Sequence, residues 1–359
     1  MREALKKHRR LLIWTAALLL LSLLCLFGYL RLSRLLDSQR AAERWKGDSD
    51  MDFAQVSAFM PGGTPLTLEQ LYAFRTAMVA KFHEAALDVD NKNQLFSDAW
   101  SGFGKVKAAG SAGKGEVGVT AVGGDYFMFH PLRLLSGGYL TAEDLMKDRV
   151  LLDRETAWLL FGGTELTGLS LTIEGVPFVV AGVIEREDDA FSRRAYGSGM
   201  GIYMSYEAYA LLNENAGISC YEVVMPQPVK GFAYTVATGK FPIGQGQLVD
   251  NSARYGFFTL LKAVKSWGSR SMQSSAVAYP YWENAARSTE DACSALLVLM
   301  LLSAAMPTVL AATVALRYGK RGKAKLEEDL LPRLKERTQE SLRVRQRRHW
   351  EKTHPDENK

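Results

Sequence analysis

Two uncharged apolar stretches, residues 11–30 and 294–316, bracket the long central part of the chain. At a rise of about 1.5 Å per residue, a helix of either length covers the roughly 30 Å hydrocarbon core of a bilayer. A folded domain held between two spans lies on one side of the membrane, with both termini on the other. We interpret the first stretch as a retained anchor rather than a cleaved signal peptide. It is longer than a usual h-region, and no small-x-small site follows it promptly.

The distribution of charge predicts which side the domain occupies. Residues 1–10 carry about +4 and residues 317–359 about +6, which leaves about −5 for the central part of a chain whose net charge is +5. Basic residues also follow the first span closely, so its own flanks do not orient it. The flanks of the second span decide the orientation, because a basic run follows it and the acidic Glu290 and Asp291 precede it. By the positive-inside rule both termini are expected to be cytoplasmic and the domain extracytoplasmic.

The cysteines limit how the outer domain is stabilised. Cys220 is the single cysteine between the spans, while Cys25 lies within the first span and Cys293 directly before the second. One cysteine cannot form an internal disulfide. The stability of the domain must therefore come from its apolar core, for which its length is ample.

Helical and strand patterns alternate along the central part. Thr67 and Gln70 form a capping box before a helix with one apolar face, and Asp153 and Gly162 mark the start and stop of a shorter helix. Glu174-Gly175 predicts a tight hairpin. Further strands are predicted at 53–59, 117–121, 201–204, 221–225 and 233–238, further helices at 205–212 and 256–265, a stalk helix over 31–50, and a loop or hairpin tip over 101–115. This order predicts an α+β domain with a strand-rich insert between mixed ends.

No constellation for catalysis is found in the sequence. Gly113-Lys114 lacks both the first glycine and the hydroxyl residue of a P-loop. His83 and His130 have no metal-binding partner at a suitable spacing. The acidic turn from Glu185 to Asp189 could bind a hard cation, but a solvated turn is the favoured interpretation. We therefore expect no enzyme activity, metal, cofactor or nucleic-acid partner.

An ordered series of glycines and aromatic residues is more informative than any single motif. It runs from a glycine–acid–aromatic step through a helix that ends in Phe-Gly to a hairpin that closes on Val-Gly-Val. Its members are Gly123, Asp125, Tyr126, Phe127, Gly137, Phe161, Gly162, Gly168, Gly175, Phe178, Gly182 and Val183. As residues they indicate scaffold: glycines at turns and phenylalanines in the core. The series resembles the extracytoplasmic core domain of MacB-like and FtsX-like ABC transporter permeases, most clearly over 123–183.

The resemblance implies an architecture and a role. The domain would combine a mixed α/β part, built from both ends of the segment, with a strand-rich insertion, and it would transmit motion or contact partners without performing chemistry. It implies a bacterial cell membrane and a separate ABC ATPase. Family members have four spans and this sequence shows two. We therefore expect it either to pair with a fuller permease subunit or to act as an adaptor. Both a homodimer and a heterodimer stay open.

The expected organisation has seven parts, and the tail leaves two alternatives open. They are a cytoplasmic N-terminus 1–10, a span 11–30, a stalk or linker 31–50, a core domain 51–250, a helical return segment 251–293, a span 294–316 and a basic tail 317–359. The tail is expected to be a helix broken at Pro332. Its arginines could contact anionic membrane lipid or a cytosolic partner, or could simply hold that end inside the cell. The alternative to a transport subunit is a membrane-tethered binding or signalling adaptor.

Overall fold

The computed structural model describes residues 2–87, 95–141, 144–196, 201–267, 270, 277, 279–325 and 331–353. The chain divides into two compact units, Phe27–Leu297 and a second made of Met1–Leu26 with Val298–Lys359. The helices are α1 (Arg2–Leu32), α2 (Ala41–Lys46), α3 (Leu68–Glu84), α4 (Tyr126–Phe129), α5 (Arg154–Phe161), α6 (Ala190–Tyr196), α7 (Tyr206–Leu212), α8 (Phe232–Lys240), α9 (Phe257–Ala263), α10 (Tyr281–Lys325) and α11 (Leu331–Thr353), with 3-10 turns η1 (Asp37–Gln39) and η2 (Val264–Ser266).

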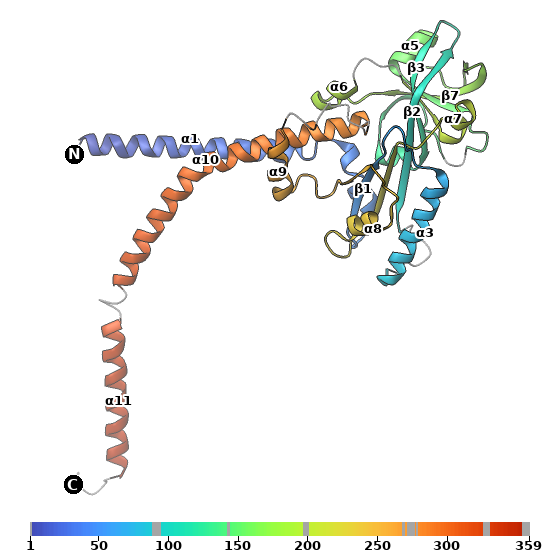
Figure 1. Cartoon of the computed structure of the whole chain (residues 1–359). Helices are drawn as coiled ribbons and strands as arrows, with labels where there is room; N and C mark the ends of the chain where they lie inside the picture. The colour runs from blue at the N-terminus through green and yellow to red at the C-terminus, as the bar shows by residue number, and fades with distance from the viewer. Residues whose placement is uncertain are drawn as a thin grey trace. The chain divides into compact units, whose positions relative to one another are not determined.

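Within the described residues, ten strands form one sheet, labelled in Figure 1 where space allows. They are β1 (Phe53–Phe59), β2 (Ser97–Ala109), β3 (Lys114–Gly124), β4 (Arg133–Gly137), β5 (Arg149–Asp153), β6 (Ser170–Ile173), β7 (Val176–Glu185), β8 (Gly201–Ser205), β9 (Cys220–Pro226) and β10 (Gln247–Asp250). The strand order is β10-β1-β9-β2-β3-β8-β5-β7-β4, and β6 pairs with both β2 and β7. The long strand β2 therefore joins two regions: it pairs with β9 through its first residues and with β6 through Ala108 and Ala109.

One region is a closed ring of strands. The pairings run from β2 to β3, β8, β5, β7 and β6 and return to β2. We call these six strands the ring. Their alternate residues meet inside it, as the period of two along a strand requires, and α5 adds Ala157 and Leu160. The buried interior includes Val106, Val117, Val119, Val150, Leu152, Leu171, Ile173, Phe178, Val180 and Ile202.

The other region is an open sheet of β10, β1, β9 and the start of β2, covered on both faces. Helices α3 and α8 pack on the face that carries Val56 and Val223. The capping box predicted at the start of α3 is confirmed: Thr67 Oγ1 accepts the Gln70 amide at 3.2 Å, and the Gln70 side chain accepts the Thr67 amide at 3.1 Å. The opposite face is covered by α2, α4 and the start of α10, where Trp282 is 2% exposed.

Two predicted elements are wrong, and a third is only partly right. The stalk helix over 31–50 is absent: α1 ends at Leu32, and α2 packs on β1 with Ala41 and Ala42 buried. The hairpin tip predicted over 101–115 is found between Ala109 and Lys114, but the rest of this range belongs to β2 and β3. Glycines in those strands allow close packing rather than forming a loop. A Cβ on Gly102 would lie 2.5 Å from the Gly217 carbonyl oxygen. Residues 233–238 lie in α8, not in a strand. Ala233, Val236 and Ala237 are buried at helical spacing, and this burial overrides the strand preference of the β-branched residues.

The apolar stretches are helical. Among the described residues, two helices are long and apolar enough to cross a membrane, Leu11–Leu32 in α1 and Tyr281–Lys320 in α10. Large apolar side chains within them are open to their surroundings; Leu12 is 65% and Leu302 69% exposed. Pro332 is the second residue of α11, within the first turn, where its missing N–H costs little. The predicted break before it falls on residues 326–330, outside the described residues. The tail residues Leu326 and Leu330 lie outside the described part.

The described cysteines carry no disulfide, as the sequence predicted. Cys25, Cys220 and Cys293 are free and buried. Burial, reinforced by the nearby Glu222 carboxylate, raises the pKa of the Cys220 thiol well above its ordinary value. The Cys220 thiol on β9 is therefore held in its neutral, unreactive form.

Candidate coupling site at the root of the second span

The glycine–acid–aromatic step of the sequence series forms the corner between β3 and α4. A Cβ on Gly123 would lie 2.2 Å from the Trp100 indole, so only glycine fits under that ring. The Asp125 carboxylate accepts a hydrogen bond from Ser97 Oγ at 2.7 Å. Tyr126 is 2% exposed, and the Phe127 ring stacks on Tyr139 at 4.6 Å between centroids. This corner is a packed structural element.

The later members of the series shape the ring. Gly137 in β4 has φ +73°, and a Cβ there would lie 2.0 Å from the Ala181 carbonyl oxygen, so β4 and β7 approach closely at this point. Phe178 and Val183 are buried in the ring, while Phe161, expected in the core, is only half-buried at its edge. The remaining glycines of the series lie at turns or in β7: Gly162, Gly168, Gly175 and Gly182. The structure places the series around the fold and does not gather it into one pocket.

A buried pair that the sequence reasoning missed lies beside this corner. His130 Nε2 is 2.5 Å from Glu222 Oε2, and both side chains are almost fully buried. The other oxygen of Glu222 accepts a hydrogen bond from Ser57 Oγ at 3.0 Å. The His130 ring contacts Tyr126 at 4.6 Å and Trp282 at 4.3 Å between centroids. The pair therefore connects α4 and β9 to the first turn of α10.

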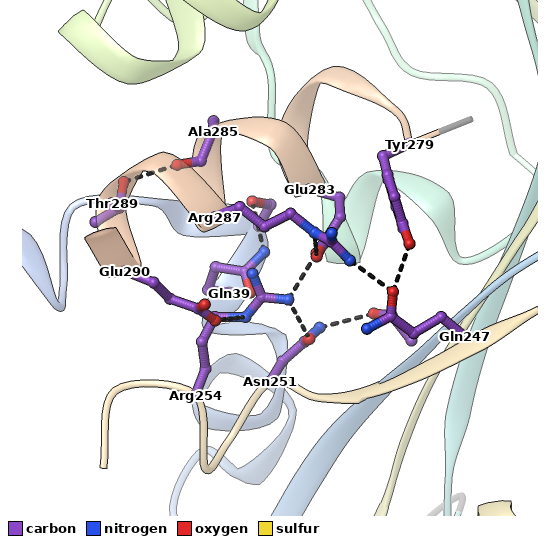
Figure 2. Close-up of polar contacts among 12 residues, drawn as sticks. Gln39, Gln247, Asn251, Arg254, Tyr279, Glu283, Ala285, Arg287, Thr289 and Glu290 are labelled. Atoms are coloured by element: carbon purple, nitrogen blue, oxygen red, sulfur yellow. Dashed lines mark hydrogen bonds and ion pairs between the residues drawn. The ribbon is translucent and has the colours of Figure 1, made fainter. Parts of the chain in front are cut away.

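A charged network fixes the start of α10 to the loop that follows β10 (Figure 2). Arg254 Nη2 donates to Glu283 Oε2 at 2.6 Å, and Arg254 Nε lies 3.3 Å from Glu290 Oε1. Glu283 also accepts from Arg287 Nε at 2.7 Å. Arg270 Nη2 lies 2.5 Å from Glu290 and 3.0 Å from Asp291. We call the three arginines and three acids of this network the charged junction: Arg254, Arg270, Glu283, Arg287, Glu290 and Asp291.

The charged junction is continuous with the buried His130–Glu222 pair. Arg254 Nη2 also donates to Asn251 Oδ1 at 3.3 Å, and Asn251 Nδ2 donates to Ser57 Oγ at 2.7 Å. Ser57 in turn contacts Glu222. An unbroken chain of polar contacts thus runs from the root of α10, across the open sheet, to the corner that carries Tyr126.

Burial makes the pairing at the charged junction decisive. The Arg254 and Glu283 side chains are 1% and 2% exposed. Burial alone would lower the pKa of Arg254, but the carboxylates of Glu283 and Glu290 outweigh it and raise that pKa above its ordinary value. The pKa of Arg270 is raised in the same way: burial opposes its charge, and Glu290 and Asp291 more than restore it. A buried charge that loses its partner costs several kcal/mol, so the arrangement tolerates little change in geometry.

The acidic turn is not simply solvated, contrary to the favoured interpretation. The Glu187 carboxylate accepts hydrogen bonds from Tyr196 and from Tyr281 of α10, the second at 3.2 Å. Asp189 Oδ1 accepts the amide of Phe191 at 2.9 Å and so begins α6. Among the residues that the structure describes, no group of three or more His, Cys, Asp and Glu side chains could hold a metal ion.

Two signals in the sequence could have identified these residues. Glu222 interrupts an otherwise apolar run from Cys220 to Met225 in a strand that is buried throughout. Glu283, Arg287, Glu290 and Asp291 recur on one helical face directly before an apolar stretch. Glu290 and Asp291 contribute to the charge pattern around the second span. They also pair with Arg254 and Arg270, which the charge pattern does not reveal.

The comparisons with known proteins agree with this fold. The model of the MacB-like periplasmic core domain family matches residues 41–231, more than half of the chain. The chain belongs to this family. The resemblance to MacB-like permeases is thereby confirmed, and the chain is a membrane protein with an extracytoplasmic domain. A comparison with curated proteins gave no match.

The chain is also similar to three solved structures, each over 53% to 59% of its length. The extracellular domain of the noncanonic ABC-type transporter YknZ from Gram-positive bacteria is 16% identical, with a TM-score of 0.37; the match covers 53% of this chain and 92% of that one. The periplasmic region of MacB from Actinobacillus actinomycetemcomitans is 13% identical, with a TM-score of 0.40 and coverages of 59% and 92%. A domain of a putative permease from Porphyromonas gingivalis is 11% identical, with a TM-score of 0.32 and coverages of 55% and 88%.

Proposed function

We propose that this protein is a non-catalytic membrane subunit of an ABC-type transport or mechanotransmission system in the bacterial cell membrane. Its extracytoplasmic domain would be coupled through the two spans to a separate ATPase, with both termini cytoplasmic. Family membership supports the class of system. The observation that carries the coupling role is the charged junction, which ties the open sheet to the root of α10.

The helix that receives this connection is long. α10 continues as one helix of 45 residues, from Tyr281 at the sheet to Lys325 beyond the apolar stretch. At about 1.5 Å per residue such a helix is roughly 65–70 Å long, more than twice the hydrocarbon core of a bilayer. A displacement of its cytoplasmic end would therefore reach the sheet through a single element. Buried ion pairs suit this task because they fix one geometry rather than many.

The contact with the ATPase is tested by two truncations of the full-length protein. One removes 326–359 and keeps all of α10; the other removes 317–359 and also removes the basic end of that helix. The shorter truncation should still insert and fold. The longer one also removes the basic run that orients the second span, so its topology is first checked by labelling of Leu211→Cys in intact cells. We expect the longer truncation to lose association with a cytosolic ABC ATPase in pull-downs from detergent-solubilised membranes. If the shorter truncation already loses it, the contact lies within residues 326–359, which include α11. If the full-length protein recovers no ABC ATPase while other membrane complexes survive, the tethered adaptor becomes the better description.

The orientation is tested by cysteine labelling in intact cells. Leu211 on α7 is 89% exposed, and Arg337 on α11 is also exposed, so a cysteine at either position should be reachable. A membrane-impermeant maleimide should modify the Leu211→Cys protein in intact cells and the Arg337→Cys protein only after lysis. Labelling of Arg337→Cys before lysis would overturn the proposed topology. The unmodified protein is the blank, because its three cysteines are buried.

A further inference from the structure

Residues 256–267 present aromatic side chains to their surroundings rather than to the core. In α9, Leu260 is 1% and Ala263 5% exposed, so one face of the helix packs on the domain. Phe257 and Phe258, on the other side, are 46% and 76% exposed and contact each other with 5.3 Å between ring centroids. Two adjacent exposed phenylalanines on a helix that already has a buried face indicate a second apolar partner.

The two ends of this segment are fixed at the outer ends of the two spans. The Tyr255 carbonyl, just before α9, accepts a hydrogen bond from Tyr29 Oη at 2.9 Å. Trp267 Nε1, just after η2, donates to Ser294 Oγ at 2.5 Å. Tyr29 is among the last residues of the first apolar stretch and Ser294 is the first residue of the second. The helix between these contacts lies beside α10 in Figure 1.

The composition of the segment fits a position at the outer ends of the spans. Tyrosine and tryptophan concentrate where a membrane meets water, since each has an apolar ring and a polar group. Tyr29 and Trp267 lie at these ends of the two apolar stretches, and Trp267 is 42% exposed. Lys262 and Lys265 are exposed on the same short stretch, where ammonium groups can meet lipid phosphates while phenylalanines meet acyl chains.

We propose that residues 256–267 lie in the extracytoplasmic membrane–water interface and that Phe257 and Phe258 insert among lipid acyl chains. The partner is thus a lipid surface. The segment follows β10 directly and leads to the charged junction through Arg270, so a lipid-anchored α9 would fix the height of the domain above the membrane. This inference does not depend on a partner ATPase.

Spin labels on the full-length protein in phosphatidylcholine vesicles test the proposal. One label is attached at Phe258→Cys and the control label at Leu211→Cys, which is also highly exposed but lies on α7 at the ring. Collisions with oxygen, which concentrates in hydrocarbon, are compared with collisions with a water-soluble nickel complex. We expect the label at 258 to gain oxygen collisions and lose nickel collisions relative to the label at 211. The protein without an added cysteine gives the background.

Two results would overturn the inference. If the label at 258 meets the nickel complex as often as the label at 211, α9 is in water. If the label at 258 is shielded from both oxygen and nickel, it is covered by protein rather than lipid. A Phe257→Ser/Phe258→Ser variant provides a second measurement, in which a label at Lys262→Cys should become more accessible to nickel than in the parent. No change at that position would also count against insertion.

Discussion

The ring and the charged junction belong to the same compact unit but are held together in different ways. The ring is closed strand to strand around an interior of valine, leucine, isoleucine and phenylalanine. The junction consists of buried ions whose partners come from the loop after β10, from Arg270 and from α10. Apolar contacts are non-directional and tolerate repacking, whereas paired buried charges depend on each partner being in place. The difference suggests that the ring gives the domain its stability and that the junction gives α10 a defined attachment.

The largest effect is expected from removal of one ion at the junction. Arg254→Ala leaves the Glu283 and Glu290 carboxylates without their shared arginine, and we expect a loss of roughly 3–5 kcal/mol in the free energy of unfolding. The measurement is thermal unfolding of the full-length protein in detergent, followed by tryptophan fluorescence. Lys105→Ala is the matched control on the ring. It also breaks one ion pair, but an exposed one with a 3.4 Å separation, and should cost at most about 1 kcal/mol. Equal shifts of the thermal midpoint for the two variants would show that the ions of the junction do not depend on their partners.

A somewhat smaller loss is expected from emptying part of the ring. Phe178→Ala should lower the free energy of unfolding by about 3–4 kcal/mol, because it removes a side chain that is only 4% exposed and leaves a cavity. Val176→Ala, two residues earlier on the same strand and 42% exposed, should change it by less than about 0.5 kcal/mol. Phe178→Leu should recover much of the loss, because the ring accepts another apolar side chain, whereas no comparable rescue is expected at Arg254. A Phe178→Leu variant as unstable as Phe178→Ala would weaken this contrast.

The smallest effect concerns the pH dependence of stability at Asp250, in the open sheet. Burial raises the pKa of Asp250, at the end of β10, although backbone amides such as that of Ala253 partly oppose the shift. A raised pKa in the folded state means that Asp250 favours folding at low pH, and that this contribution is lost as pH rises through the folded value. Asp250→Asn should therefore raise the thermal midpoint slightly at pH 7 and lose this advantage below about pH 4. The exposed Asp48→Asn is the control. A lower midpoint for Asp250→Asn at pH 7 would contradict the assignment.

The two regions also differed in how well the sequence predicted them. In the ring, the hairpin at Glu174-Gly175 and the short helix capped by Asp153 were predicted correctly, because turn and capping residues act locally. In the segment 101–115 the hairpin tip was predicted but the strands beside it were not. Glycines in those strands accommodate side chains from distant parts of the chain, such as Tyr209 beside Gly104. No local sequence pattern indicates a close contact of this kind between distant residues.

Periodicity places the junction residues of α10 on one helical face but does not identify their partners Arg254 and Arg270. Arg254 and Glu283 are far apart in the sequence and are brought together only by the return of the chain after β10. The sequence pattern around His130 tests only for a metal ligand. It does not indicate Glu222 as a partner, because the two residues lie far apart in the sequence, at the end of α4 and on β9. The helix expected over 31–50 failed for a related reason. Gln55 on β1 takes the Ala41 amide and so fixes the start of α2 against the sheet.

The two ends of the strand order have a consequence for assembly. The terminal strands are β10, with four residues, and β4, with five residues and a register shift between Leu134 and Ser136. Short or irregular outer strands are poor templates for the addition of a strand from another chain. A second copy of this domain, or a partner protein, would therefore be expected to dock through side chains on helices and loops rather than by extending the sheet.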